Sequence, residues 1–182
     1  MTLANKITTL RIFLIPFFIF FLYSHMEYGF LIAAIIFLIC AVTDFVDGYI
    51  ARKQNTVSIF GKVFDPIADK ILVVSALIPL TEMNLLPAWV SIVLISREFV
   101  ISGFRIVHAQ YGENVIAASW LGKIKTVMQD TFIVMIMLES YLSFLHEYYI
   151  TWVFIILGVI FAIWSMADYI LKNIKTMNVK DN

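Results

Sequence analysis

The sequence predicts an all-α integral membrane protein with six transmembrane helices. Two observations lead to this fold class. First, 62% of the 182 residues are hydrophobic and only 14% are charged, whereas charged residues make up about a quarter of a soluble domain. Second, the apolar residues fall in long runs, and a helix needs about 20 of them to cross the hydrocarbon core of a bilayer. We therefore expect membrane lipids around the protein and no nucleic-acid partner.

Six apolar runs separated by short polar breaks mark the expected helices. A lead-in at residues 3–10 is expected to lie at the membrane interface, because its apolar and polar residues can face lipid and water separately. The expected spans then cover residues 9–23, 29–52, 63–80, 87–107, 119–142 and 149–171. No small-residue cleavage site follows the first run, so we expect it to be a span and not a signal peptide. Since no linker separates the runs, we expect residues 1–182 to form a single membrane domain.

Lysine and arginine are distributed unevenly between the breaks. Three breaks, residues 24–28, 81–86 and 144–148, contain none of the 13 basic residues. The basic residues lie in the N-terminal segment, around the second-to-third and fourth-to-fifth connections, and in the C-terminal tail. Because lysine and arginine concentrate on the cytoplasmic side of a membrane, we expect both termini and the even-numbered connections to face the cytoplasm.

Four aspartates stand out around the second connection, because carboxylates are costly at membrane depth and tend to mark functional sites. Asp44 and Asp47 are three residues apart, and Asp65 and Asp69 are four apart. These spacings place each pair on one face of a helix. Since the connection is short, we expect two antiparallel neighbouring helices whose carboxylates share one cavity at the cytoplasmic end.

Four converging carboxylates repel one another unless cations balance them. Carboxylate oxygens suit Mg²⁺ or Mn²⁺ better than Zn²⁺, and no His or Cys cluster accompanies them. Two such ions can bridge a diphosphate and stabilise charge on attacking and leaving oxygens, while one carboxylate takes a proton. We therefore expect two divalent cations, and the sequence does not distinguish Mg²⁺ from Mn²⁺.

Small and basic residues accompany the aspartates. Gly48 and Ala51 keep one helical face thin enough for a flat base or a phosphate to approach, Gly61 gives similar clearance on the next helix, and Arg52 can grip a phosphate with two hydrogen bonds. Structural alternatives exist for single residues. Gly48 and Ala51 also suit close helix packing, and Asp65 before a proline also suits a helix N-cap.

The complete pattern is D-x-x-D-G-x-x-A-R, eight residues, then G-x-x-x-D-x-x-x-D, and it resembles the signature of the CDP-alcohol phosphotransferase family at every defining position. The resemblance implies a six-helix membrane fold, usually a homodimer, with a two-metal site. It implies that Asp44, Asp47 and Asp65 bind metal and that Asp69 is the base and also contacts metal. The residues implied to line the CDP site are Gly48, Ala51, Arg52 and Gly61.

Further motifs extend the resemblance over nearly the whole chain, toward bacterial family members. They are Asn5-x-x-Thr8-x-x-Arg11, Arg97-Glu98-Phe99 and Gly122-Lys123-Ile124-Lys125-Thr126. By resemblance, Asn5 and Thr8 belong to the CDP site, and the acceptor is sn-glycerol 3-phosphate. An anionic acceptor needs cations, and the candidates on the cytoplasmic side are Arg97, Arg105, Lys123 and Lys125. Each of these is alternatively a positive anchor at the membrane surface.

The function that the resemblance implies is transfer of the phosphatidyl group of CDP-diacylglycerol to sn-glycerol 3-phosphate, which gives phosphatidylglycerophosphate and CMP. The site would face the cytoplasm from the bacterial inner membrane. Alternatives are a family member that uses another acceptor (a phosphatidylserine, phosphatidylinositol phosphate or cardiolipin-type synthase) or, more remotely, a small cation-binding transporter. Two further acids in the expected spans, Asp130 and Asp168, are read as helix-to-helix hydrogen-bonding residues in preference to catalytic ones.

Overall fold

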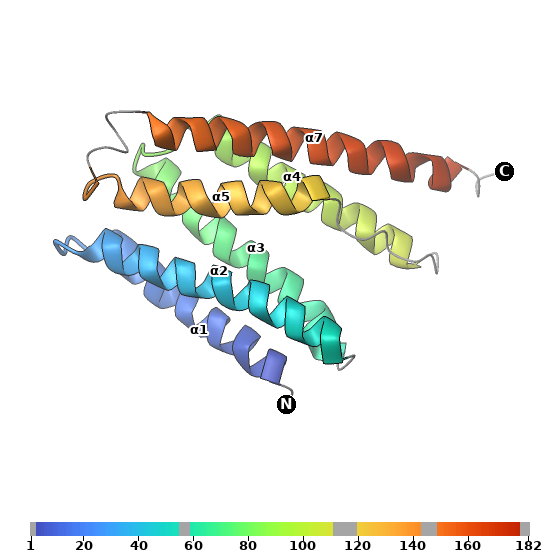
Figure 1. Ribbon diagram of the computed structural model, residues 1–182, viewed down its shortest axis with the longest axis horizontal. Coiled ribbons are helices and arrows are strands. Elements are labelled where there is room, and N and C mark those ends of the chain that lie inside the picture. Colours follow the sequence, from blue (N-terminus) through green and yellow to red (C-terminus); the bar gives the residue numbers. More distant parts are fainter. Residues whose placement is uncertain (1–2, 55–58, 111–119, 143–148, 179–182) are drawn as a thin grey trace. The chain divides into compact units, whose positions relative to one another are not determined.

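The computed structural model describes residues 3–54, 59–110, 120–142 and 149–178, and the side chains described are those of residues 9–43, 67, 70–105, 120–142 and 149–172. This part of the chain forms six helices and no strands (Figure 1). The helices are α1 (Leu3–Tyr23), α2 (Gly29–Gln54), α3 (Ile59–Glu82), α4 (Ala88–Gln110), α5 (Trp120–Leu138) and α7 (Ile150–Asn178). The all-α prediction is confirmed for the described residues.

The chain divides into two compact units, each built from two separate stretches. Met1–Leu85 and Ile133–Tyr148 form the first unit, and Leu86–Phe132 and Tyr149–Asn182 form the second. Helix α5 therefore begins in the second unit and ends in the first.

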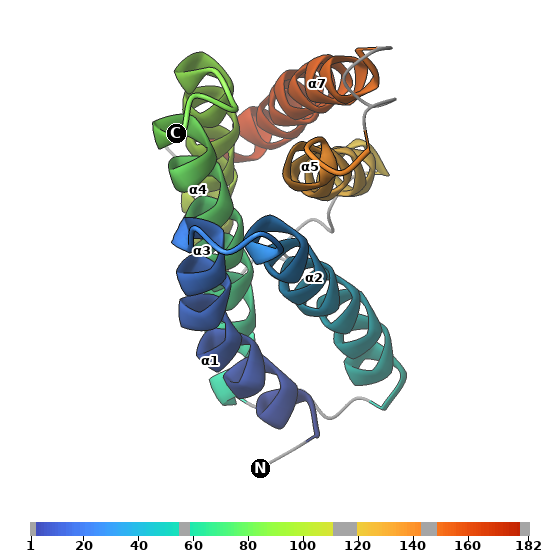
Figure 2. The same ribbon diagram turned by 90° about the vertical axis from the view of Figure 1, so that its left-hand side faces the viewer.

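Helices α1, α2 and α3 pack together in the first unit, where α1 contacts both of the others and α2 contacts α3 (Figures 1 and 2). The centre of this contact is an aromatic pair. Phe18 of α1 and Phe37 of α2 are 0% and 1% exposed, and their ring centroids lie 5.8 Å apart. On α3, Leu77 and Leu80 are fully buried. Close side-chain packing of this kind is what holds helices together where lipid replaces water.

The turn from α1 to α2 depends on a glycine. The backbone N–H and the hydroxyl of Ser24 both donate to the carbonyl of Phe21, at 3.2 and 2.8 Å. A Cβ atom on Gly29 would lie 2.8 Å from that same carbonyl oxygen and 2.5 Å from Ser24 Oγ. Any larger residue would have to push the end of α1 away, so the sharp reversal requires glycine at this position.

Helix α3 ends in a Schellman motif. Asn84 adopts a left-handed conformation with φ of 59°. Its N–H donates to the carbonyl of Thr81 at 3.0 Å, and the N–H of Leu85 donates to the carbonyl of Leu80 at 2.9 Å. Asparagine tolerates this conformation better than most residues, and Pro87 follows immediately before α4. These features explain why the chain leaves α3 and starts α4 within a few residues.

Hydrogen bonds in the first unit join segments at or beside the three breaks that lack basic residues. The hydroxyl of Tyr23, at the end of α1, donates to the carboxylate of Glu82 at the end of α3. The hydroxyl of Tyr141, just after α5, donates to the backbone carbonyl of Glu27 at 2.6 Å. The ends of α1 and α3, the start of α2 and the segment after α5 therefore lie at one end of this unit.

In the second unit, α4 contacts α7, and the first part of α5 adds Phe132 to the core. Leu94 of α4, Phe132 of α5 and Ala162 of α7 are all fully buried. A Cβ atom added to Gly158 of α7 would lie 3.2 Å from Cε1 of Phe132. The phenylalanine ring of α5 thus lies directly over the glycine of α7, and the absence of a side chain there leaves room for the ring.

Many large apolar side chains point away from the protein. On α1, Phe13, Phe17 and Phe20 are 66%, 57% and 63% exposed, in contrast to the buried Phe18. In the described residues, Ile150–Lys172 is long and apolar enough to cross a membrane, and Thr9–Tyr23 and Gly29–Thr43 are shorter apolar helices. An apolar outer surface on fully hydrogen-bonded helices is typical of proteins whose solvent is lipid.

The helix ends differ from the expected spans. The first helix begins at Leu3 and not at residue 9, so the expected interfacial lead-in is continuous with the rest of α1. The third begins at Ile59, which places Asp65 and Pro66 inside α3. The alternative that Asp65 is an N-cap is therefore wrong. Both helices extend past their apolar runs because backbone hydrogen bonding does not stop where hydropathy does. In contrast, α5 ends at Leu138 and not at the expected residue 142, because the chain turns there.

The contact of Gly158 with the Phe132 ring leads to a prediction about stability. Gly158→Leu should lower the free energy of unfolding by about 1–3 kcal/mol, because the new side chain overpacks the contact between α5 and α7. Thermal unfolding of the purified protein in detergent would measure this. The control is Gly103→Leu, because a Cβ atom at Gly103 of α4 meets nothing within 4 Å. Equal melting temperatures for the two variants would contradict the prediction.

Candidate active site

The four aspartates lie on two helices of the first unit that contact each other. Asp44 and Asp47 are in α2, and Asp65 and Asp69 are in α3. Because both helices are continuous through these positions, each pair occupies one helical face. Only residues 55–58 separate the two helices, which run in opposite directions (Figure 1). The backbone therefore agrees with the predicted arrangement, while the aspartate side chains lie outside the described residues.

The predicted CDP-site residues lie on the same three helices. Gly48, Ala51 and Arg52 are in α2, and Gly61 is in α3. Asn5 and Thr8 are in α1, which contacts both of these helices. The side chains of all six lie outside the described residues, so their contacts remain predictions.

One basic residue of the N-terminal motif is described. Arg11 of α1 is only 2% exposed. A guanidinium among apolar helices is costly unless it has polar partners. Burial therefore separates Arg11 from an ordinary surface charge and makes it part of the interior of the first unit.

The described part of the second unit contains a buried cluster of charged side chains. The Lys125 ammonium of α5 donates to Oε1 of Glu98 on α4 at 2.5 Å, and Nη1 of Arg97 donates to the same oxygen at 2.9 Å. Nη2 of Arg97 donates to the hydroxyl of Ser165 on α7 at 3.2 Å. The exposed fractions of the Lys125, Arg97 and Glu98 side chains are 1%, 10% and 20%. Two predicted acceptor residues, Arg97 and Lys125, are thus brought together by an acid between them.

Several polar atoms near this cluster make no hydrogen bond within the described part of the chain. They include Nε of Arg97, Nε of Arg105, and both amide atoms of Gln129. Gln129 is 0% exposed and follows Lys125 by one helical turn on α5. Buried polar atoms normally have partners, so these donors and acceptors are available to a polar ligand.

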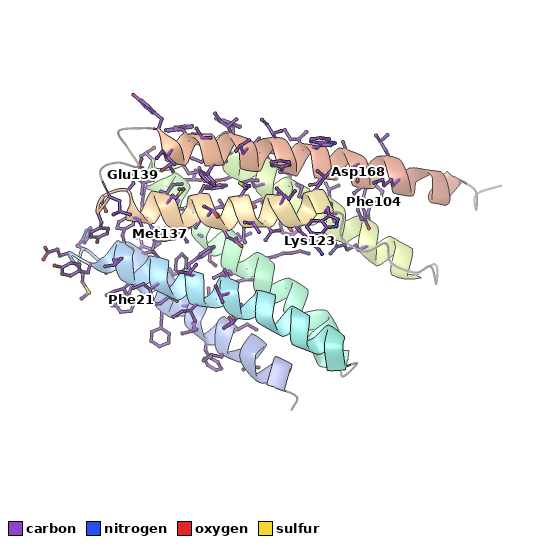
Figure 3. All side chains as sticks on the ribbon, in the orientation of Figure 1. Phe21, Phe104, Lys123, Met137, Glu139 and Asp168 are labelled. Atoms are coloured by element: carbon purple, nitrogen blue, oxygen red, sulfur yellow. The ribbon has the colours of Figure 1, made fainter. Side chains whose placement is uncertain are left out.

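The other two predicted acceptor cations differ from this pair. Lys123 is exposed on α5, where its ammonium lies 5.0 Å from the ring centroid of Trp120 (Figure 3). This placement agrees with the alternative of a surface anchor, because an exposed cation over an aromatic ring needs no further partner. Arg105 of α4 is half-buried. Lys123 and Lys125 are two residues apart and therefore lie on nearly opposite faces of the helix.

The two acids that were expected to form helix-to-helix hydrogen bonds are not alike. Asp168 of α7 pairs with Lys172 of the same helix, at 2.7 Å between Oδ1 and Nζ. Among the described side chains, Asp168 therefore pairs one turn along its own helix, where a hydrogen bond to another helix was expected. Asp130 of α5 is half-buried and interacts electrostatically with Lys125.

The sequence analysis did not single out Glu98, Gln129 and Ser165, which lie in or beside this cluster. Glu98 was visible only as part of the Arg97-Glu98-Phe99 motif, and its bond to Lys125 joins residues 27 positions apart. Gln129 does carry a sequence signal, because an amide one turn after a lysine is unusual in an apolar helix. Nothing in the sequence marks Ser165, which meets Arg97 across 68 positions.

The four aspartates are the residues whose chemistry suits a metal site. Among the described side chains, no group of three or more His, Cys, Asp or Glu residues could hold a metal ion. The four aspartates form a donor set made only of carboxylates on two adjacent helices. This donor set fits hard divalent cations such as Mg²⁺ and Mn²⁺.

Comparison with known proteins identifies the family. Residues 1–164 match the profile of the CDP-alcohol phosphatidyltransferase family. The chain is 43% identical over 195 aligned residues to a protein of Bacillus subtilis named CDP-diacylglycerol–glycerol-3-phosphate 3-phosphatidyltransferase, with 97% of this chain and 98% of the relative covered.

Proteins with the same name in other bacteria give a similar result. The relative in Haemophilus influenzae is 39% identical over 90% of this chain and 89% of its own length. The relative in Shigella flexneri is 36% identical over 92% of each. The family that the aspartate signature predicted is confirmed: the chain belongs to the CDP-alcohol phosphatidyltransferase family of membrane enzymes.

Proposed function

We propose that the chain transfers the phosphatidyl group of CDP-diacylglycerol to sn-glycerol 3-phosphate, giving phosphatidylglycerophosphate and CMP. The observation that carries this proposal is the 43% identity, over 97% of the chain, to a relative whose name states both substrates. The buried pair of Arg97 and Lys125 supports it from the structure. An acceptor with a phosphate group needs cations, and these two lie side by side.

The aspartates carry the chemical roles in this proposal. Asp44, Asp47 and Asp65 would hold two divalent cations, Mg²⁺ or Mn²⁺, and Asp69 would contact them and is the proposed base. When bound, such cations supply charge stabilisation for the diphosphate. Asp69 accepts the proton of the 1-hydroxyl of the acceptor. The hydroxyl oxygen then forms a bond to the lipid-side phosphorus, and the bond from that phosphorus to the diphosphate bridging oxygen breaks.

The leaving group is CMP, and the residues proposed to hold its nucleotide are spread over α1, α2 and α3. Arg52 is proposed to bind a phosphate of the CDP group through its planar guanidinium. The remaining CDP-site residues are Asn5, Thr8, Gly48, Ala51 and Gly61. Contacts among the three helices in the first unit support this grouping.

The proposed acceptor-phosphate residues are Arg97, Arg105 and Lys125. Arg97 and Lys125 meet at Glu98, and Arg105 lies two turns after Arg97 on α4. Lys123 is less suited, because it is exposed over Trp120. We therefore leave Lys123 out of the proposed acceptor site and assign it to the protein surface.

The proposed topology has six spans, with both termini and the site on the cytoplasmic side of the bacterial inner membrane. The hydrogen bonds of Tyr23 to Glu82 and of Tyr141 to Glu27 support it, because they gather segments at the breaks without basic residues at one end of the first unit. We also propose a single domain over residues 1–182, since α5 belongs partly to each unit. A homodimer completes the proposal, on the basis of family resemblance.

An acceptor panel tests the proposed reaction. Purified protein in detergent is given CDP-diacylglycerol, Mg²⁺ or Mn²⁺, and one radiolabelled acceptor: glycerol 3-phosphate, serine, inositol phosphate or phosphatidylglycerol. We expect label to enter lipid, with release of CMP, only from glycerol 3-phosphate. Label from another acceptor would assign a different synthase activity. A lack of CMP release with every acceptor would contradict the enzymatic proposal and favour the transporter alternative.

The base assignment predicts the effect of Asp69→Asn. This variant should lose turnover by at least about 100-fold, because an amide cannot accept the hydroxyl proton. Its binding of CDP-diacylglycerol, measured as a shift in thermal unfolding with metal present, should be largely kept. Asp168→Asn is the control, since Asp168 pairs with Lys172 of its own helix. Retained activity of Asp69→Asn would show that another group takes the proton.

The two lysines of α5 give a matched pair of variants. Lys125→Met should raise the KM for glycerol 3-phosphate by about tenfold or more, because a buried charge-assisted contact to the phosphate is lost. Lys123→Met should change this KM less than about threefold, since exposed charges contribute little. Steady-state kinetics with saturating CDP-diacylglycerol would measure both. Equal effects of the two substitutions would refute the assignment of Lys125.

A further inference from the structure

Glu98 lies between the two cations that are proposed to bind the acceptor. A single oxygen, Oε1, accepts from Lys125 Nζ at 2.5 Å and from Arg97 Nη1 at 2.9 Å. Lys125 comes from α5 and Arg97 from α4, so the carboxylate joins two helices. Both hydrogen bonds are charge-assisted and therefore stronger than neutral ones.

Cations outnumber acids among the described side chains around Glu98. Lys125 and Arg97 are almost fully buried, and Arg105 acts on Arg97 electrostatically. The acids are Glu98, which is hydrogen-bonded to Lys125 and Arg97, and Asp130, which acts on Lys125 electrostatically. Nε of Arg97 makes no hydrogen bond in the described part of the chain. A buried group of cations with an unused donor suits an anion.

The geometry of a free lysine would be poorly defined without Glu98. A lysine ammonium moves on a flexible four-carbon stem, and fixing it costs conformational free energy on binding. A residue that fixes the ammonium beforehand removes this cost from the binding step, which is the general effect of preorganisation. Ser165 acts similarly on the other side of Arg97, because its hydroxyl accepts from Nη2 at 3.2 Å and itself donates to the carbonyl of Ala162 at 3.1 Å.

We propose that Glu98 is a positioning residue for the acceptor: its carboxylate holds the Lys125 ammonium and the Arg97 guanidinium in the arrangement in which they receive the acceptor's phosphate. Glu98 itself does not touch the reacting atoms. This inference rests on the proposed function, since it needs Arg97 and Lys125 to bind the acceptor. It adds a role for an acid at a site where only cations were expected.

Two variants separate the effect of the charge of Glu98 from the effect of its side-chain length. Glu98→Gln keeps the shape and loses the charge, whereas Glu98→Asp keeps the charge but is one methylene too short to hold both partners. Both should raise the KM for glycerol 3-phosphate, Glu98→Gln by about tenfold or more. The KM for CDP-diacylglycerol should stay within about twofold of wild type. Glu27→Gln is the matched control, because Glu27 is exposed.

A double variant tests whether Glu98 acts through Lys125. If it does, the effects of Glu98→Gln and Lys125→Met on the acceptor KM should be less than multiplicative when combined, as expected for residues that act together. Multiplicative effects would show that Glu98 acts elsewhere. If Glu98→Gln does not fold, Glu98→Asp decides the matter, because it keeps the buried charge balance.

The wild-type protein is measured first with glycerol 3-phosphate and CDP-diacylglycerol. Absence of phosphatidylglycerophosphate from the wild type would overturn the proposed function. An active wild type with unchanged acceptor KM in both Glu98 variants, or with only kcat and melting temperature lowered, would overturn the positioning role alone. A selective rise in the acceptor KM supports it, because a merely structural acid would reduce the active fraction without changing KM.

Discussion

The cost of placing charge among apolar helices is the constraint on which the described interior depends. The side chains of Lys125 and Arg97 are only 1% and 10% exposed, and each has a hydrogen-bonding partner. Glu98 and Ser165 supply acceptors from α4 and α7, so three helices contribute to one polar cluster. Removing one member of such a cluster leaves a buried charge without its partner, which is why these contacts also help to hold the helices of the second unit in place.

Much of the fold was predictable because lipid imposes simple rules on sequence. Six helices lie over the six apolar runs, and the helix ends lie at or near the polar breaks. The exact ends were not predictable. Hydropathy locates the part of a helix that suits the bilayer, whereas backbone hydrogen bonds continue until a motif such as that at Asn84 ends them. For this reason α1 begins at Leu3 and α3 continues through Pro66.

The candidate site was also predictable only in part: features set by a single helix could be predicted, whereas contacts between helices could not. Spacing along one helix predicted which aspartates share a face, because helical periodicity is fixed. The family could also be read from the complete signature. Contacts between helices could not be predicted: Lys123 and Lys125 look equivalent in the sequence, yet one lies over Trp120 and the other bonds Glu98. An ion pair between residues far apart in the sequence depends on how the helices pack, and the pattern of residues along the sequence does not specify that packing.

The pairing of Arg97 with its neighbour Glu98 has a consequence for the order in which the chain enters the membrane. Both residues belong to α4, and their side chains bond each other at 2.9 Å. Synthesis proceeds from the N-terminus, so α4 can leave the ribosome with its arginine already paired and needs no later helix to balance that charge. Lys125 arrives afterwards on α5, where the same carboxylate oxygen is in place to receive it. The carboxylate that pairs with Arg97 within α4 is thus the same group that pairs with Lys125 of the later helix α5.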